Sequence, residues 1–431
     1  MTVNTHINKQ KWWSIVSYGK GNNTFFDKLC ALVFALVPIL QHYIGIVQNA
    51  GYSLLLLISP YLALKLLKRI SKGSINSRII VTVFPLILFE LYTVFIHGFQ
   101  LSRFFYVLFL IFLFLSIASG CVNISYFYKY ATYIAIFATV VVVVQYITHY
   151  VFHRNIDLRF LEYLVRDDTI WDRTAEAIAG LDVSSYFYRP SGFFLEPSHF
   201  FLYTFPLIGV LLLTPNINRQ RKKVALFLSL GILLTTSGMG IGVVTLFWTI
   251  YYMLKNNTNG IKGVLAKFFS TRSFLILIAI VAVVFVAYLF VPVIHSSIDR
   301  IITENDNNAI DGRVRLAKSF AQTISGRAVF IGTPGITSDM DFNLSGFYAT
   351  FFKWGIVGLF FTYWFYIQGL FKLKGPFFWI SLVIVVISYF TAHTHGTFYM
   401  LYFILFLMNG YYERSRVKFQ PVSEPQPMIA S

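Results

Sequence analysis

Apolar runs of about twenty residues recur along the whole chain and are separated by shorter polar segments. A helix of about twenty apolar residues crosses the roughly 30 Å hydrocarbon core of a bilayer. Only 12% of the 431 residues are charged, about half the fraction usual in a soluble protein. We therefore expect an all-α polytopic membrane protein with about 12 transmembrane helices. The predicted spans are 29–48, 51–68, 79–98, 103–121, 130–150, 197–213, 223–237, 240–254, 273–292, 345–370, 376–392 and 396–411.

Basic residues are concentrated in every second segment between these spans. If the N-terminus is cytoplasmic, 23 of the 35 Lys and Arg residues face inward and 12 face outward. Of the 18 acidic residues, 14 face outward, three face inward and Glu90 lies within a span. Short basic loops are typical of the cytoplasmic side of membrane proteins. The formal charge of +17 therefore indicates topology and not a nucleic-acid partner, and both termini are predicted to be cytoplasmic.

Two predicted outer loops are much longer than the other connections, and they carry ten basic residues, nine of which are Arg. Guanidinium groups bind phosphate oxygens in a bidentate manner and keep their charge in most surroundings. These loops could therefore hold a lipid-linked diphosphate, although pairing with the outer acidic residues explains any single Arg equally well. The predicted organisation is 1–28 cytoplasmic segment, 29–150 helices 1–5, 151–196 outer loop, 197–292 helices 6–9, 293–344 outer loop, 345–411 helices 10–12 and 412–431 cytoplasmic tail.

The segment from Arg189 to His199 places several chemically active side chains where the first outer loop meets an apolar run. Proline restricts the residue before it, so Pro190 and Pro197 disfavour helix at Arg189 and Glu196. A helix is expected to begin at Pro197, since proline suits a first helical turn. Glu196 is the strongest candidate for a general base, with His199 as the second catalytic candidate. Alternatively, Glu196 caps the helix or pairs with Arg189, and His199 is structural.

Glu90 lies inside the third predicted span, seven residues before His97. An acidic residue within a membrane span is a candidate for function, and a polar contact with a neighbouring helix is the alternative. The cytoplasmic segments contain neither a P-loop nor a glycine-rich nucleotide motif. We therefore expect no cofactor, no metal and no direct nucleotide substrate.

Three motifs resemble the O-antigen polymerases (Wzy), within the wider O-antigen ligase/polymerase superfamily of bacterial membrane proteins. Arg189 to Pro197 is similar to an R-x-x-G-x-x-x-E-P stretch at the end of the first large outer loop in that family. The stretch from Leu233 to Gly238 is similar to the family's Thr/Ser-rich hairpin turn, and Ser345 to Gly358 resembles the start of the span after the second loop. An R-x10-G pattern is found once, from Arg315 to Gly326, whereas the family is described with one in each loop.

The resemblance implies a metal-independent, GT-C-like glycosyltransferase in the bacterial inner membrane that polymerises O-antigen or capsule repeat units. It would transfer the growing glycan from undecaprenyl diphosphate to the non-reducing end of an incoming lipid-linked repeat unit. Its partners would be this undecaprenyl-diphosphate-linked oligosaccharide, the bilayer, a chain-length regulator and a flippase. We assign Arg189, Arg313, Arg315 and Arg327 to the diphosphate, and Gly192, Gly326 and Glu90 to substrate binding.

Two other functions fit a chain of this class. An O-antigen ligase would carry a histidine at the start of the span after the second loop, where this chain reads Phe342-Asn343-Leu344-Ser345. A flippase or transporter typically has a long inner linker between its halves and polar residues at the bilayer midplane. Here spans six and seven are joined by about ten residues, and Glu90 is nearly the sole polar candidate in a span.

Overall fold

Apolar helices dominate the part of the protein that the structure describes, as the apolar runs predict. The computed structural model describes residues 24–41, 49–97, 99–154, 189–214, 219–255, 326–333, 346–389 and 396–417, and the single residues 43, 45, 46, 156, 282, 289 and 324. These residues are almost all helical and form no strand. By length and composition, five helices of this part can cross a membrane: α2 (Ala50–Ser71), α3 (Ser77–His97), α4 (Leu101–Ala118), α5 (Ile124–Phe152) and α16 (Gly346–Lys372).

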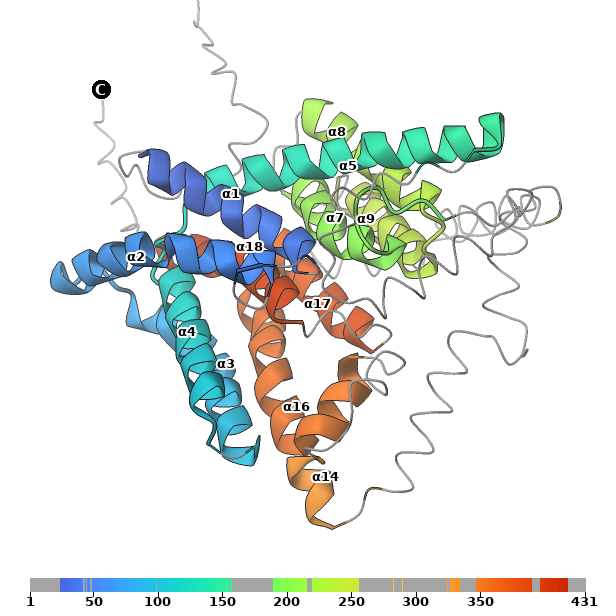
Figure 1. The fold of residues 1–431 in the computed structure, drawn as a ribbon. Helices are drawn as coiled ribbons and strands as arrows, with labels where there is room; N and C mark the ends of the chain where they lie inside the picture. Colours follow the sequence, from blue (N-terminus) through green and yellow to red (C-terminus); the bar gives the residue numbers. More distant parts are fainter. Residues whose placement is uncertain are drawn as a thin grey trace, which may run out of the picture.

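Shorter helices complete the described architecture (Figure 1). Every predicted span except 273–292 overlaps a described helix, and 273–292 lies almost entirely outside the described residues. The all-α membrane class is thus confirmed, whereas the number of twelve crossings stays a prediction. The shorter helices are α1 (Phe25–Leu40), α7 (Pro197–Leu213), α8 (Arg219–Leu234), α9 (Gly238–Lys255), α14 (Arg327–Ile331), α17 (Pro376–Ser388) and α18 (Thr397–Val417).

The first predicted span, 29–48, extends further than the helix that the structure places there. Helix α1 ends at Leu40, and its residue Pro38 accepts a hydrogen bond at its carbonyl from the Gln41 side chain at 2.9 Å. The chain then turns back, because the Ala50 amide donates to the Tyr43 carbonyl at 2.9 Å. The turn cannot be recognised from a run of apolar residues alone, so the predicted span is too long.

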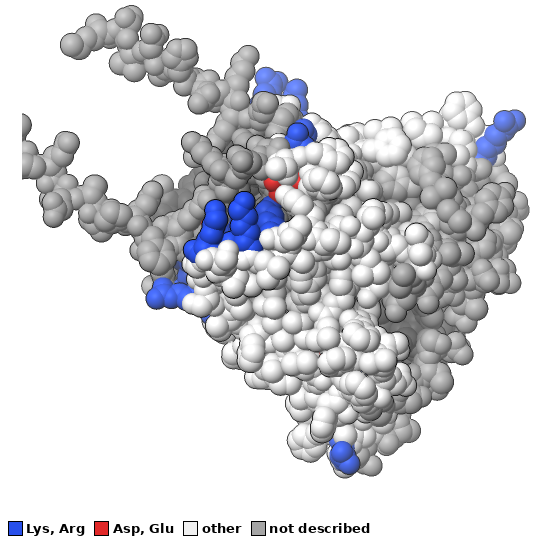
Figure 2. All heavy atoms as spheres, turned by 60° about the vertical axis from the view of Figure 1, so that its left-hand side comes forward, with Lys and Arg blue, Asp and Glu red and all other residues white. Residues whose placement is uncertain are grey.

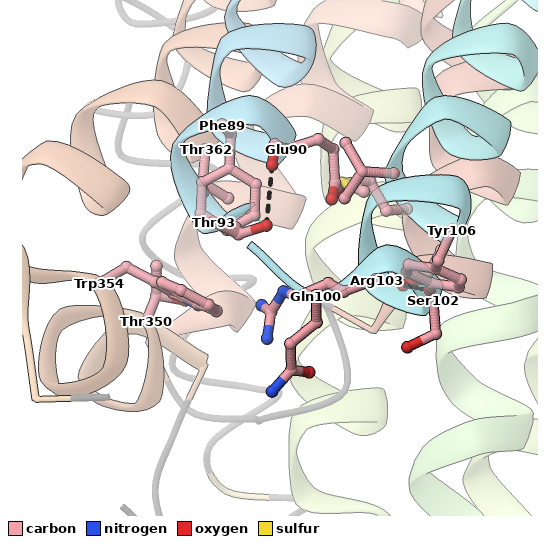
Figure 3. A pocket seen from close by; sticks show the side chains of 13 residues that line it. Phe89, Glu90, Thr93, Gln100, Ser102, Arg103, Tyr106, Thr350, Trp354 and Thr362 are labelled. Carbon is pink, nitrogen blue, oxygen red and sulfur yellow. Dashed lines mark hydrogen bonds between the residues drawn. The ribbon is translucent and has the colours of Figure 1, made fainter. Parts of the chain in front are cut away.

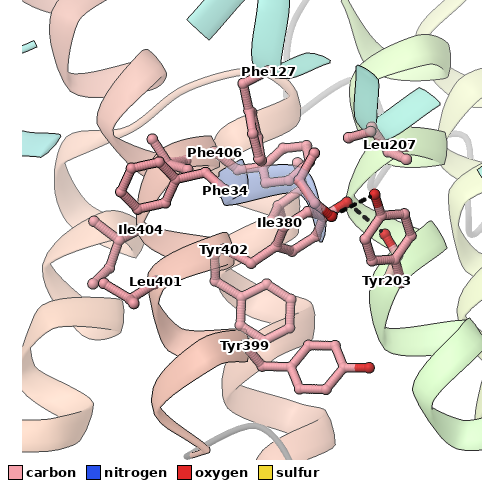
Figure 4. Packing of buried hydrophobic residues seen from close by; sticks show 14 of the residues in the cluster. Phe34, Phe127, Tyr203, Leu207, Ile380, Tyr399, Leu401, Tyr402, Ile404 and Phe406 are labelled. Carbon is pink, nitrogen blue, oxygen red and sulfur yellow. Dashed lines mark hydrogen bonds between the residues drawn. The ribbon is translucent and has the colours of Figure 1, made fainter. Parts of the chain in front are cut away.

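Helix α7 occupies the centre of the packed helices. All its residues from His199 to Leu213 are buried, and it contacts α5, α8, α9, α17 and α18. Tyrosine hydroxyls join it to its neighbours: Tyr203 donates to the Ala35 carbonyl of α1, and Tyr402 of α18 donates to the Tyr203 carbonyl, each at 2.9 Å (Figure 4). Hydrogen bonds between helices satisfy hydroxyls that hydrocarbon cannot solvate. The two tyrosine rings also stack, with centroids 4.8 Å apart.

Helix ends that are predicted to be cytoplasmic gather at one place. Lys65 near the end of α2 forms an ion pair with Asp27 at the start of α1, and it also donates to the Cys121 carbonyl at 2.7 Å. Arg69 donates to the Ser119 carbonyl at 2.6 Å, so the α4–α5 turn is held by two basic side chains. The start of α1 and the ends of α2 and α4 are thus on the same side, as the predicted topology requires.

The outer surface of these helices matches a membrane environment. Figure 2 shows most Lys and Arg side chains of this face gathered in one region, next to a broad area in which the described side chains are uncharged, with isolated basic side chains at the bottom tip and at the upper right edge. Large apolar side chains are exposed there, because a helix in lipid turns apolar residues outward. Examples on α2, α3 and α4 are Leu57, Leu64, Leu67, Phe84, Phe95 and Phe105.

The short helix α14 packs against a kink in α16 at one tip of the molecule (Figure 1). Gly355 has the left-handed φ of 64° there, and an added Cβ would overlap the Phe330 carbonyl of α14. Gly332, at the other end of the contact, has a φ of 76°. The sequence predicts an outer loop over 293–344 and no helix at Arg327–Ile331, so α14 differs from that expectation. Because α14 has only five residues, its packing on α16 supplies its stability.

Candidate functional site

The turn before α7 is fixed to α5 through its glycine. The Gly192 amide donates to the Gln145 side-chain oxygen at 2.8 Å, and the Gln145 amide group donates back to the Gly192 carbonyl at 3.0 Å. Gly192 has a φ of 68°, and an added Cβ would lie 3.2 Å from the Ala138 carbonyl oxygen. Only glycine adopts this conformation without strain while approaching a helix backbone so closely. Gly192 therefore holds the turn on α5, and its assignment to substrate binding stays a prediction.

Glu196 lies at the N-cap position of α7, which begins at Pro197 as the sequence predicts. Its carbonyl accepts from the His199 amide at 3.0 Å, whereas its carboxylate makes no capping hydrogen bond to the helix. That carboxylate is exposed and accepts from the Ser198 hydroxyl at 2.9 Å. The Glu196 side chain therefore does not cap the helix, whereas its pairing with Arg189 stays a prediction. A carboxylate that is exposed at a helix N-terminus is stabilised as an anion.

His199 is buried between α7 and α18, with 3% of its surface exposed. The Tyr399 hydroxyl donates to the His199 carbonyl at 3.0 Å, and the two rings lie 5.9 Å apart. Tyr399 also interacts electrostatically with Glu196. The first turn of α18 thus contacts His199 and lies within electrostatic range of Glu196.

A second polar feature is a pocket of about 440 Å³ between α3, α4, α16 and α18 (Figure 3). Glu90 of α3, which is 6% exposed, lines it together with Arg103 near the start of α4. These are the charged residues among the described side chains of its wall, and they interact electrostatically. The Arg103 guanidinium lies over the Trp354 ring of α16, 5.5 Å from its centroid. The pocket therefore brings an anion, a cation and an aromatic surface together in a low-dielectric setting.

The wall of this pocket is held by hydrogen bonds between helices. The Tyr92 hydroxyl donates to the Trp354 carbonyl at 3.0 Å, next to the kink of α16. Tyr106 of α4 and Thr397 of α18 are joined through their hydroxyls at 3.0 Å. Since the described wall comes mainly from four helices, its side chains are held in defined positions.

One turn of α18 connects the pocket with the motif. Thr397 and Met400 line the pocket, whereas Tyr399 between them contacts His199. The helix ends at this place are the C-terminus of α3 and the N-termini of α4, α7, α16 and α18. All five are predicted to lie on the outer side, so the two polar features belong to the same face of the predicted topology.

The arginine candidates are only partly described. Arg189 is half-buried just before the Gly192 turn, and Arg327 is exposed at the start of α14, after Gly326 with its φ of 57°. Helix α14 packs on the α16 kink beside Trp354, so Gly326 and Arg327 belong to an element that adjoins the pocket. Arg313 and Arg315 lie outside the described residues. The structure therefore brings together Glu196 with His199, and places Glu90 in a neighbouring pocket.

Sequence reasoning overlooked three residues of this region: Arg103, Gln145 and Trp354. Gln145 is a single amide inside the apolar run of α5, and Arg103 is a single cation in the first turn of α4. Either could have been flagged, because an isolated polar residue at a membrane helix usually has a partner. Trp354 carries no such signal, since aromatic residues are frequent throughout this chain.

Comparisons with known proteins give no assignment. No family model matches the chain, and no curated protein matches it.

Proposed function

We propose that this protein is a membrane glycosyltransferase that polymerises the repeat units of a bacterial surface polysaccharide. The observation that carries the proposal is the pocket with Glu90 and Arg103, linked by the first turn of α18 to the segment with Glu196 and His199. Both features lie at helix ends that are predicted to face away from the cytoplasm. The similarity of Arg189 to Pro197 to the O-antigen polymerase motif supports the same function.

In the proposed reaction, a hydroxyl oxygen of the acceptor sugar attacks the anomeric carbon of the lipid-linked donor glycan. The bond from that carbon to the diphosphate oxygen breaks, and undecaprenyl diphosphate leaves with the electron pair. Glu196 takes the hydroxyl proton or anchors the acceptor sugar. His199, which is buried one turn further along α7, is the second catalytic candidate. Arg189, with Arg313, Arg315 and Arg327 of the second loop, stabilises the charge that develops on the leaving diphosphate.

Deletion of the gene, followed by a gel of the surface glycan, tests this function against its alternatives. A polymerase defect leaves one repeat unit on each lipid. Absence of glycan on lipid A core would indicate a ligase, and loss of all export would indicate a flippase. Restoration of the full ladder by the plasmid-borne gene is the control.

A further inference from the structure

We propose that the pocket of Glu90, Arg103 and Trp354 binds one uncharged sugar residue of the glycan. This inference rests on the proposed function, since it names the part of the substrate that this pocket recognises. It assigns a binding role to Arg103 and Trp354, two residues outside the sequence motifs. The volume of about 440 Å³ lies within the range of about 300–1,000 Å³ typical of small-ligand pockets.

The chemistry of the pocket wall matches a polyhydroxylated ligand. Each sugar hydroxyl both donates and accepts a hydrogen bond, so a sugar site needs acceptors and donors side by side. Glu90 supplies carboxylate acceptors, and Arg103 and Gln100 supply N–H donors. Further hydroxyls line the wall at Thr93, Ser102 and Thr350. Aromatic rings at Phe89 and Tyr106 can pack against the apolar C–H face of a sugar ring.

Two of these donors, Arg103 and Gln100, are positioned to bind a ligand. Arg103 lies over Trp354, which fixes the plane of the guanidinium while its N–H groups at the edge stay able to donate. Gln100 is the N-cap residue of α4, yet its side chain makes no capping hydrogen bond. Figure 3 shows the Arg103 guanidinium and the Gln100 amide between Trp354 on one side and the α4 residues Ser102 and Tyr106 on the other.

The charge balance of the pocket selects an uncharged sugar. Glu90 is the acidic and Arg103 the basic side chain of the described wall, and the two interact across the same space. A hexuronic acid would have to lose the water around its carboxylate to enter the pocket, and the attraction of that carboxylate to Arg103 would be offset by repulsion from Glu90. An amino sugar would lose the water around its ammonium group in the same way, and its attraction to Glu90 would be offset by repulsion from Arg103. A hexose or N-acetylhexosamine leaves the pair balanced, and its hydroxyls can bond to both groups.

Binding to the full-length protein in lipid nanodiscs tests this assignment directly. The probes are methyl hexosides and methyl N-acetylhexosaminides, with methyl hexuronosides as charged counterparts, and the signal is tryptophan fluorescence. We expect a saturable change with a neutral glycoside but not with a hexuronoside. The change should be lost in Trp354→Phe and kept in Trp364→Phe, whose half-exposed ring stacks on Phe360 elsewhere on α16.

Two variants test the polar groups. Glu90→Gln should weaken binding roughly tenfold, which corresponds to about 1.4 kcal/mol. Gln100→Ala should weaken it several-fold, and because Gln100 is exposed and caps nothing, this variant is expected to fold even if Glu90→Gln does not. Equal binding of hexuronosides, unchanged binding in both polar variants, or no binding of any neutral glycoside would overturn the assignment.

Failure of this inference is distinguishable from failure of the proposed function. Wild-type protein that polymerises lipid-linked repeat units but binds no neutral glycoside in this pocket would disprove the sugar site alone. Conversely, the protein could bind neutral glycosides as described and yet show no polymerising activity. That result would support the sugar site and disprove the proposed polymerase function.

Discussion

At the scale of single residues, the best-defined interaction of the motif is that of Gly192 with α5. Its backbone exchanges two hydrogen bonds with Gln145, and its φ of 68° excludes most other residues. The residues on either side of this turn, Arg189 and Glu196, are the proposed diphosphate ligand and base. Correct placement of both therefore depends on a side chain in the middle of an apolar helix.

Gly192→Ala should destabilise the protein more than the same change at a solvent-facing turn. A left-handed conformation costs an alanine about 1–2 kcal/mol, and at Gly192 the new Cβ would also lie 3.2 Å from the Ala138 carbonyl oxygen. Gly73→Ala is the matched control, because Gly73 has a φ of 58° and a Cβ added there would have no atom within 4 Å. Thermal unfolding in detergent measures the difference, and equal losses at both glycines would contradict the docking contact.

Glu196→Gln should reduce polymerisation about 10²-fold or more if Glu196 is the base. Glutamine keeps the shape and the hydrogen bond from Ser198, but it cannot take a proton. Ser198→Ala removes only that hydrogen bond and should have a much smaller effect. If Glu196→Gln, expressed normally, works at a near wild-type rate on purified lipid-linked repeat units, Glu196 is not the base, and His199→Ala is the next variant.

At the scale of helices, the α16 kink connects the described part of the second outer loop with the pocket. The Thr333 amide donates at 2.8 Å to the Phe352 carbonyl, just before the kink. Tyr92 donates to the carbonyl of Trp354, two residues further along. Side chains and loop backbone thus satisfy carbonyls that a kinked helix leaves without their usual partners.

Gly355→Ala should displace α14 and lower stability beyond the cost of backbone strain. The added Cβ would overlap the Phe330 carbonyl, and no side-chain movement can relieve a clash with backbone. Gly375→Ala is the matched control, since Gly375 has a φ of 58° and an added Cβ there would meet no atom within 4 Å, so that this variant carries the backbone strain without the clash. Similar unfolding midpoints for the two variants would show that α14 does not pack on the kink.

Helix positions can be predicted from this sequence, whereas helix partners cannot. Apolar runs locate α7 and the start of α16 well, because hydrocarbon thickness sets the length of a span. The pairing of Glu90 with Arg103, and of Gln145 with Gly192, comes from tertiary packing between helices and leaves no local pattern. The early end of α1 escapes prediction for a related reason, since Tyr43 and Asn49 belong to a turn made of residues that are mostly apolar.

At the scale of the whole molecule, the described helix ends divide into two groups. The start of α1 and the α4–α5 turn meet at Lys65, while the starts of α4, α16 and α18 meet around the pocket. This division agrees with the sides that the basic residues predict. Which group faces the cytoplasm follows from the distribution of Lys and Arg.

Reporter fusions at Asn259 and Asp306 should therefore report opposite sides of the membrane. Asn259 lies in a basic predicted inner loop, and Asp306 lies in the acidic second outer loop. A phosphatase that is active only outside and a fluorescent protein that is active only inside give complementary signals. Signals from the same side would contradict the predicted topology, and with it the outer location of the second loop on which the proposed chemistry depends.

Polymerisation by the purified protein tests the central claim most directly. Wild-type protein in proteoliposomes would be given purified undecaprenyl-diphosphate-linked repeat units, and the products separated on a gel. The account predicts a ladder of longer lipid-linked glycans with release of undecaprenyl diphosphate, without added nucleotide. Repeat units that stay single, or that only cross the bilayer, would contradict it.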